Sequence, residues 1–339
     1  MHSAPGFWDE RPGFLANLLL PMGAAWDAAG WLRHALTRPY RPPVPVVCVG
    51  NLVAGGAGKT PVALALASEF TARGVAVHMV TRGYGGRLGG PVRVDPACHD
   101  ADAVGDEALL LAARAPSWVA RDRAAGVCAA AAVGAELVIL DDGFQNPSIA
   151  KDFSLVVVDA MYGFGNGRVI PAGPLREGLG RGLARADAIV LLDTEAGRIC
   201  LERDLGRMLP ILPAVLAPVA GERLAGSRLL AFAGIGRPEK FFVTLRSLGA
   251  VLVGTRAFPD HHRFSVQDIE ELFREAERAD ARLVTTAKDI VRVPLSMRAG
   301  IEVLKVEIRW PDPGALAGLI GPVVLSARTH GRRPVEPNR

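Results

Sequence analysis

The sequence predicts a doubly wound α/β fold with a mostly parallel sheet, followed by a smaller α/β lobe. Short, nearly continuous apolar runs alternate with segments of helical periodicity, as expected of strands that helices cover on both faces. A glycine-rich turn directly follows the first apolar run. After residue 220 a second, shorter set of alternating strands and helices begins. A Leu- and Trp-rich segment suited to a membrane surface precedes both sets.

The expected elements divide the chain into four regions. These are an N-terminal interfacial helical segment (1–41), a core domain (42–220), a smaller C-terminal α/β lobe (221–328) and a disordered tail (329–339). The strands expected in the core are Val44–Val49, Val75–Val80, Glu136–Leu140, Leu155–Asp159 and Ala188–Leu192. Around 201–219 the pattern loosens, and a Pro-interrupted linker is expected. The smaller lobe is expected to contain strands Leu229–Ala233, Val251–Ala257 and Arg282–Thr286, with helices Pro238–Leu248 and Ser265–Ala279.

Composition narrows the function classes. The chain has 339 residues, enough for one large or two medium domains. Its formal charge of +4 suits a phosphate, a nucleotide or an anionic lipid surface. Nucleic-acid binding is not expected, because aromatic residues are only 6% and no basic stripe is interleaved with them. The four cysteines stand far apart, which suits a reducing cytoplasm better than a disulfide framework or a metal site.

The N-terminal segment suggests membrane contact without membrane crossing. It lacks a basic leader and carries Asp9 and Glu10, so a cleaved signal peptide is not expected. Its uncharged run from Pro12 to Trp26 contains Pro21 and falls short of the roughly 20 apolar residues of a spanning helix. Leu and Trp residues followed by basic ones fit an interfacial anchor. A pair of core-packing helices is the alternative, and it stays open.

The glycine-rich turn predicts a phosphate-binding loop. Residues 50–60 read GNLVAGGAGKT between an expected strand and an expected helix, so backbone N–H groups and the helix N-terminus can surround an anion. Lys59 can reach the β- and γ-phosphates, and the Thr60 hydroxyl can hold Mg²⁺. The expected nucleotide-binding residues are Val53, Ala54, Gly55, Gly56, Ala57, Gly58, Lys59 and Thr60. Val53 stands where the strict pattern has its first glycine. The alternative is a glycine-rich turn with a surface lysine that has no role in phosphate binding.

An acidic pair follows another apolar strand. The run at 137–140 ends in Asp141 and Asp142, where P-loop enzymes place a carboxylate that completes the Mg²⁺ shell directly or through water. A solvated Asp-Asp turn is the alternative, which is less common beside a Lys-Thr pair.

The motifs together resemble one known family. Besides the loop, the chain contains RGYG (82–85), GDE (105–107), DDGFQ (141–145), PAGPLRE (171–177), FPDHH (258–262) and TTAKD (285–289). In this order, from about Val44 to Val306, they resemble the tetraacyldisaccharide 4′-kinase family, the lipid A 4′-kinases of lipopolysaccharide synthesis. The chain departs from the family pattern at Asn146, where the family usually has His, and at Ala108, where it has Pro.

The resemblance implies a reaction, a place and a catalytic pair. It implies transfer of the γ-phosphate of ATP, with Mg²⁺, to the 4′-hydroxyl of a tetraacyldisaccharide 1-phosphate, a lipid A precursor. It implies Asp106 as the base toward that hydroxyl, His261 as its dyad partner and Lys59 at the phosphates. Without the resemblance, Asp106 would be a helix cap and His261 a loop histidine. Because the acyl chains lie in the inner leaflet, the enzyme is expected to be peripheral to the cytoplasmic face of the inner membrane, with no obligate protein partner.

Further residues complete the expected site. The metal candidates are Thr60, Glu107, Asp141, Asp142 and Glu177. The substrate-binding candidates are Asn51, Arg82, Tyr84, Arg123 and Arg176. Guanidinium groups match phosphate oxygens in pairs, although any one of these arginines can instead be a surface residue. His262 is expected to point elsewhere.

Two other function classes are compatible with a P-loop. One is a GTPase switch or metal-insertion ATPase, which an N-K-x-D motif would favour, but Lys288-Asp289 lacks the preceding Asn. The other is a nucleotide-binding scaffold without catalysis, which turnover dependent on a disaccharide lipid would exclude.

Overall fold

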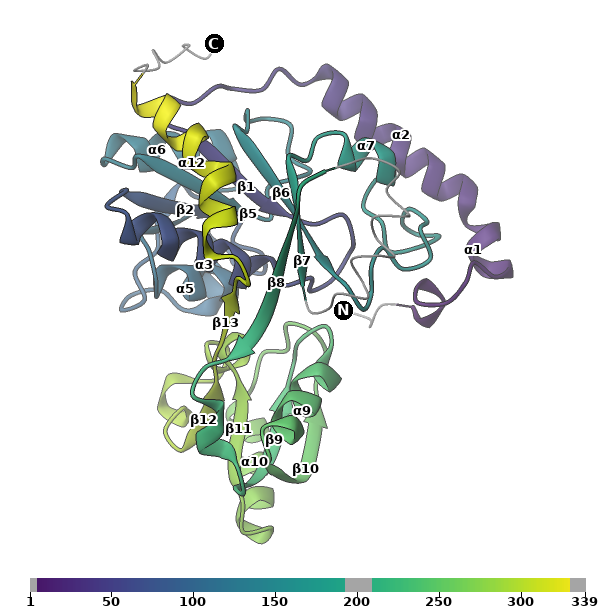
Figure 1. Cartoon of the computed structure of the whole chain (residues 1–339). Coiled ribbons are helices and arrows are strands. Elements are labelled where there is room, and N and C mark those ends of the chain that lie inside the picture. Colours follow the sequence, from purple (N-terminus) through teal and green to yellow (C-terminus); the bar gives the residue numbers. More distant parts are fainter. Residues whose placement is uncertain (1–4, 193–208, 330–339) are drawn as a thin grey trace.

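Two lobes make up the structure, which is a computed structural model that describes residues 5–192 and 209–329. Figure 1 shows the larger lobe, built on the sheet that contains β1, with the smaller lobe below it. The long strand β8 (Ile211–Pro218) runs from the larger lobe toward the smaller one.

The larger lobe is built on a nine-stranded sheet of order β13-β8-β7-β6-β1-β5-β2-β4-β3. Its other strands are β1 (Val46–Gly50), β2 (Val77–Thr81), β3 (Val92–Arg93), β4 (Ser117–Val119), β5 (Leu137–Asp141), β6 (Phe153–Asp159), β7 (Ala188–Leu192) and β13 (Val306–Arg309). From β8 to β4 every neighbouring pair is parallel, whereas the two edge strands pair antiparallel. The doubly wound, mostly parallel fold expected from the sequence is therefore confirmed.

Helices cover both faces of this sheet. They are α3 (Lys59–Ala72), α4 (Ala101–Val104), α5 (Asp106–Ala112), α6 (Arg123–Ala132), α7 (Leu179–Leu183) and α12 (Pro313–Thr329). Side chains alternate along β1, so that Val47 belongs to a buried cluster with Leu66 of α3 and Leu316 of α12, while Cys48 belongs to a second cluster with Val127 of α6. Because β1 is buried on both faces, the glycine-rich loop that follows it begins at a fixed point in the core.

The smaller lobe has its own parallel sheet of order β10-β9-β11-β12. Its elements are η2 (Gly221–Leu224), β9 (Arg228–Ala233), α9 (Pro238–Ser247), β10 (Val251–Ala257), α10 (Val266–Arg278), β11 (Arg282–Thr286), α11 (Ala287–Ile290), η3 (Leu295–Met297) and β12 (Ile301–Leu304). Phe242 of α9 packs on one face and Leu272 of α10 on the other. The Ser265 hydroxyl caps α10 in a reciprocal bond pair with Asp268, which explains where that helix begins.

Two segments differ from the expected organisation. The expected linker 201–219 contains β8, whose register with β7 places it inside the main sheet; 201–208 lie outside the described residues. The expected lobe 221–328 ends earlier, because β13 pairs with β8 and α12 buries Ile320 against the core. The chain thus crosses back into the larger lobe after β12. Apart from its first residue, the expected tail 329–339 lies outside the described residues.

The N-terminal helices lie on the outside of the larger lobe (Figure 1). They are η1 (Gly6–Trp8), α1 (Phe14–Leu18) and α2 (Leu20–Leu36). One side of α2 docks on the core: the Trp26 indole N–H donates to the Arg176 carbonyl, and Asp27 accepts a bond of 2.7 Å from the Gly178 N–H. Large apolar side chains of both helices remain exposed to solvent, with Phe14 of α1 84% and Leu36 of α2 75% exposed. Within the described ranges, no helix is both long and apolar enough to cross a bilayer.

Candidate active site

The glycine-rich loop has the geometry of an anion cradle. Gly58 is left-handed at φ 80° and starts α3, and a Cβ on it would lie 2.4 Å from Leu192 Cδ1, so only glycine fits. Lys59 is buried, and its ammonium donates to Asn51 Oδ1 at 3.2 Å. The loop is held from behind, because Ala54 N–H donates to the Pro174 carbonyl and Arg176 N–H to the Leu52 carbonyl. The predicted phosphate loop thus has a rigid support supplied by the PAGPLRE segment.

The acidic pair after β5 lies beside the start of α3. The Thr60 hydroxyl donates to Asp141 Oδ2 at 3.0 Å, while Asp142 Oδ1 accepts from Arg176 at 2.9 Å and lies 3.7 Å from the Lys59 ammonium. Burial raises the pKa of Asp142, but the charges of Lys59 and Arg176 outweigh it and hold that pKa below its usual value. Asp142 also has a left-handed backbone at φ 55°, a conformation that costs energy in a non-glycine residue.

Asp141 fits a magnesium ion. Its Oδ1 is buried and has no hydrogen-bond partner among the described residues. Burial, together with the charges of Glu107 and Asp142, raises the pKa of Asp141 to about 7. Mg²⁺ sites of this kind use one or two carboxylates together with substrate phosphates, and the Asp141 carboxylate fits that role. The orphaned oxygen of Asp141 and the Thr60 hydroxyl beside it are the atoms that would hold such an ion.

Asp106 and His261 come together from different lobes. Asp106 is the first residue of α5, and His261 lies in the loop after β10 with a left-handed backbone at φ 59°. The imidazole Nδ1 lies 3.0 Å from Asp106 Oδ2, and the carboxylate is only 4% exposed. Asp106 Oδ1 accepts from its neighbour's N–H at 2.9 Å. The pair predicted from the sequence is therefore in direct contact.

Two cations of the smaller lobe surround this pair, and sequence reasoning gave neither of them a role. The Lys288 ammonium lies 3.3 Å from His261 Nε2, and the Arg292 Nε lies 3.4 Å from Asp106 Oδ2. Because an ammonium only donates, Nε2 must accept, so the imidazole carries its proton on Nδ1 and donates it to Asp106. Lys288 lies in the TTAKD motif, and Arg292 follows four residues later. This spacing was the only sequence signal that the two side chains could lie on the same side of the chain.

These charges keep Asp106 ionised. Burial alone would raise its pKa, but the hydrogen bond from His261 and the charges of Lys288 and Arg292 outweigh burial and lower the pKa below the ordinary value. Arg292 is itself held by Asp289 at 2.7 Å and by the Gly234 and His262 carbonyls. A buried carboxylate in this setting is a hydrogen-bond acceptor at all physiological pH values.

The dyad and the phosphate loop adjoin each other. A Cβ on Gly236, in the loop after β9, would lie 3.7 Å from the Gly56 backbone nitrogen and 3.4 Å from Asp260 Oδ2. Glu107 lies between the clusters: its carboxylate is 3.4 Å from Lys288, and its charge raises the pKa of Asp141. The nucleotide loop, the acidic pair and the dyad therefore share one site between the lobes.

The other residues that the sequence suggested for substrate or metal binding differ in how exposed they are and in what they contact. Tyr84 is exposed, and its ring centroid lies 5.2 Å from that of His261. Arg82 is exposed as well. Arg123 is buried with its Nη1 on the Ala120 carbonyl at 2.6 Å, so it acts on the acidic pair by its charge rather than by open contact. Glu177 accepts from Gln145 and Arg185, at 3.1 and 2.8 Å, which favours a structural role over metal binding.

His262 and Asn146 also have clear surroundings. His262 stacks on Phe258 with ring centroids 4.7 Å apart and contacts Asp268, so it points away from the dyad as expected. Asn146 Oδ1 accepts from the Ser148 N–H and hydroxyl, so it organises the loop after β5.

A P-loop at the first strand of a doubly wound sheet, with an acidic strand end beside it, places the chain in the class of P-loop nucleotide-binding proteins. The family described as tetraacyldisaccharide-1-P 4′-kinase matches residues 15–324. The chain is 54% identical to the tetraacyldisaccharide 4′-kinase of Rhodospirillum centenum, over 97% of this chain and 99% of the relative. It is 53% identical to that of Paramagnetospirillum magneticum, over 96% and 99%. The chain belongs to the tetraacyldisaccharide 4′-kinase family.

A solved structure agrees with this assignment. The crystal structure of "apo" form LpxK from Aquifex aeolicus in complex with ATP superimposes with a TM-score of 0.72 at 25% identity, covering 92% of this chain and 100% of that one. The protein is therefore an ATP-dependent kinase, and the GTPase-switch and non-catalytic scaffold alternatives are set aside.

Proposed function

We propose that the protein transfers the γ-phosphate of ATP to the 4′-hydroxyl of a tetraacyldisaccharide 1-phosphate, a lipid A precursor. The names of the relatives support this acceptor. The observation that carries the proposal is the buried contact between Asp106 and His261 beside the phosphate loop. A carboxylate of the larger lobe that a histidine of the smaller lobe orients beside the phosphate loop is suited to take the proton of an acceptor hydroxyl.

Asp106 acts as the base in this proposal. A sugar hydroxyl is a poor nucleophile, and its proton must leave as the phosphoryl group arrives. The carboxylate is ionised and its orientation is fixed by Nδ1–H of His261, whose tautomer is in turn set by Lys288. The proton moves from the hydroxyl to the carboxylate, and the hydrogen bond from His261 keeps the carboxylate in place for this transfer.

The phosphate side is held by the larger lobe. Backbone N–H groups from Gly55 to Lys59 bind the phosphates, and the Lys59 ammonium neutralises charge as the γ-phosphoryl group leaves. Thr60 and Asp141 would hold Mg²⁺, which supplies charge neutralisation at the phosphate oxygens. Asp142, paired with Arg176, keeps the Lys59 side chain oriented.

The protein is proposed to work at the cytoplasmic face of the inner membrane as a peripheral protein. The exposed apolar side chains of α1 and α2 would enter the headgroup region, with Phe14, Leu18 and Leu36 among the most open. The docked side of α2 contacts the segment that carries Arg176, so the membrane surface and the active site are joined by one helix. Acyl chains could then stay in the leaflet while the sugar enters the site.

An acceptor comparison tests the function. The protein is mixed with ATP, Mg²⁺ and either the tetraacyldisaccharide 1-phosphate or its 4′-deoxy analogue, and the lipids are analysed by mass spectrometry. We expect addition of one phosphoryl group to the first lipid and none to the second. Phosphorylation of the 4′-deoxy analogue would place the acceptor oxygen elsewhere.

A further inference from the structure

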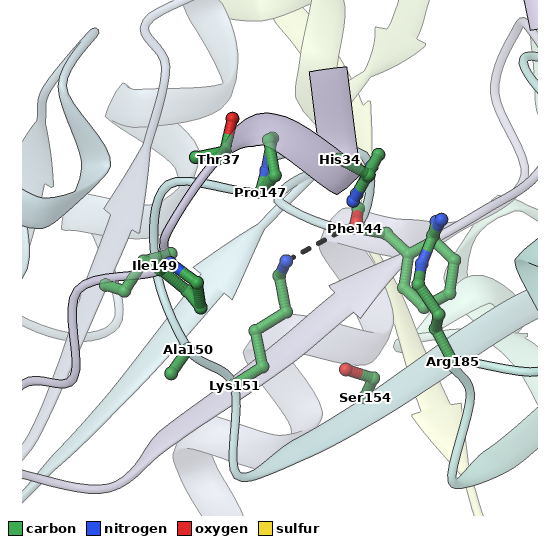
Figure 2. A pocket seen from close by; sticks show the side chains of 10 residues that line it. His34, Thr37, Phe144, Pro147, Ile149, Ala150, Lys151, Ser154 and Arg185 are labelled. Atoms are coloured by element: carbon green, nitrogen blue, oxygen red, sulfur yellow. Dashed lines mark hydrogen bonds between the residues drawn. The ribbon is translucent and has the colours of Figure 1, made fainter. Parts of the chain in front are cut away.

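A second hollow lies beside the end of α2, away from the residues of the proposed reaction (Figure 2). Its volume is about 250 Å³, and it is bounded by α2, the loop after β5 and the start of β6. The residues that line it are His34, Thr37, Pro39, Phe144, Pro147, Ile149, Ala150, Lys151, Ser154 and Arg185. Figure 2 shows Lys151 near the middle of these side chains, with Arg185 and His34 to one side of it and Ile149 to the other.

The lining is basic. His34, Lys151 and Arg185 contribute to it, and no lining residue is acidic. The Lys151 ammonium donates to the backbone carbonyls of Phe144 at 3.4 Å and Asn146 at 2.5 Å, which are neutral acceptors. Burial lowers the pKa of Lys151, which reflects the cost of keeping this cation away from water. An anion in the hollow would offset that cost.

The hollow is also lined by Arg185, which adds positive charge, and by His34. Arg185 is partly neutralised by Glu177 at 2.8 Å and lies over the Phe144 ring at 5.0 Å. Burial and the charge of Arg185 lower the pKa of His34, so its imidazole is neutral at pH 7 and can offer an anion a hydrogen bond rather than a charge. A guanidinium, an ammonium and an imidazole around one small space suit a tetrahedral phosphate oxyanion.

The position of the hollow indicates the source of the phosphate. His34 lies on the last turn of α2, the same helix whose exposed Trp31 and Leu36 face away from the core. A helix lying in the interfacial plane would bring its polar end to headgroup depth. We propose that this hollow binds the phosphate group of an anionic membrane lipid and so fixes the orientation of the protein on the bilayer. The proposal rests on the proposed membrane docking, but not on the proposed chemistry.

Vesicle binding tests the proposal with matched variants. Phosphatidylcholine vesicles with and without phosphatidylglycerol are used in flotation assays with wild type, Lys151→Met, His34→Glu and the control Arg38→Met. Arg38 is exposed, lies close to the same helix end and is absent from the lining, so its loss reports ordinary surface attraction of about fivefold. We expect both pocket variants to lose at least about tenfold on anionic vesicles, as for a charge-assisted hydrogen bond, and nothing on phosphatidylcholine alone.

A soluble-phosphate arm separates the two sources of the ligand. Inorganic phosphate is titrated into protein whose nucleotide site is filled with a non-hydrolysable ATP analogue, and binding is followed by ³¹P line broadening. Weakening in the pocket variants together with the vesicle result supports the lipid site. Weakening here, with vesicle losses no larger than for Arg38→Met, overturns the lipid assignment in favour of a free phosphate. If the pocket variants bind both vesicles and inorganic phosphate as wild type does, the hollow is not an anion site.

Activity provides the folding control. The pocket residues used as variants touch none of the proposed catalytic groups, so both variants should retain kinase activity toward acceptor in detergent micelles. If Lys151→Met fails to fold because its carbonyl partners lose their donor, His34→Glu on the half-exposed helix face still decides the matter.

Discussion

His261 Nδ1 lies 3.0 Å from Asp106 Oδ2, although the two residues are 155 positions apart. The contact joins the larger lobe to the smaller one, as do the contacts of Lys288 with Glu107 and of Arg263 with Asp102, at 3.4 and 3.2 Å. The left-handed backbone of His261 costs energy that the surrounding contacts must offset. The pairing of the proposed base with its partner therefore depends on how the two lobes meet.

The first prediction is that Asp106 and His261 act as one unit. Asp106→Asn and His261→Gln should each lower kcat by about 10²- to 10⁴-fold, the range of a general base, with little change in KM for ATP. The double variant should lose hardly more than Asp106→Asn alone, since the imidazole then has no carboxylate to orient. Steady-state kinetics of the three variants check this, and fully additive losses would mean independent roles.

The second prediction concerns Lys288 and pH. Removing its charge in Lys288→Met takes away a group that lowers the pKa of Asp106, so that pKa should rise. Because the base must be ionised, activity should then be lost at a higher pH on the acidic side of the kcat/KM profile. Lys240→Met, which removes a lysine paired instead with Asp159, is the control and should leave that limb in place. If the acidic limb of the kcat/KM profile did not shift in Lys288→Met, Lys288 would have no electrostatic effect on the base.

The third prediction concerns the free-energy cost of ionising the buried Asp141 carboxyl. The pKa of this carboxyl is raised to about 7 in the folded protein, above its unfolded value, so stability is present at low pH and lost as pH rises toward 7. Asp141→Asn should therefore raise the Tm of the nucleotide-free protein more at pH 8 than at pH 5, while lowering kinase activity. Thermal unfolding at both pH values checks the sign. An equal Tm change at both would show that Asp141 does not ionise within this range.

Magnesium gives the same residue a second test. With a non-hydrolysable ATP analogue present, added Mg²⁺ should raise the Tm of wild type more than that of Asp141→Asn. Asp187→Asn is a suitable control, because Asp187 accepts from the Ser154 N–H and lies in none of the site contacts. If Mg²⁺ stabilised Asp141→Asn as much as wild type, the ligand assignment would fail.

The fourth prediction concerns membrane contact. Replacing Leu18 and Leu36 by Ser removes exposed apolar surface that the core does not use, so vesicle partitioning should fall while Tm stays within about 1 °C of wild type. Val243→Ser, at an equally exposed apolar position on α9 of the smaller lobe, is the matched control. Deletion of residues 1–36 is a poorer test, because Trp26 and Asp27 support the segment around Arg176. Equal partitioning of all variants would remove the anchor interpretation.

The local features of the site could be predicted from the sequence. The loop at 50–60 and the acids at 141–142 each follow a buried strand, and parallel strands bring their carboxyl ends to one edge. The strand at 251–257 was predicted with its observed bounds because flanking turns mark it. The family resemblance supplied Asp106 and His261, which composition and periodicity alone could not have linked.

Long-range pairing could not be predicted in the same way. Strand β13 follows β12 after a single residue, Lys305, yet pairs with β8 in the other sheet, and no local pattern marks that change of partner. The sequence predicted a linker at β8 because prolines interrupt the apolar run there, whereas the central strands are continuous apolar runs. Lys288 and Arg292 were missed for a related reason, since their role depends on how the lobes meet.

The most direct test is single-turnover transfer of ³²P from γ-labelled ATP to the tetraacyldisaccharide 1-phosphate, with wild type and Asp106→Asn compared under saturating ATP and Mg²⁺. We expect label on the lipid with wild type, and a rate lower by at least about 10²-fold with Asp106→Asn at unchanged nucleotide affinity. Equal transfer rates for the two proteins would contradict the central claim that the carboxylate held by His261 takes the proton of the acceptor.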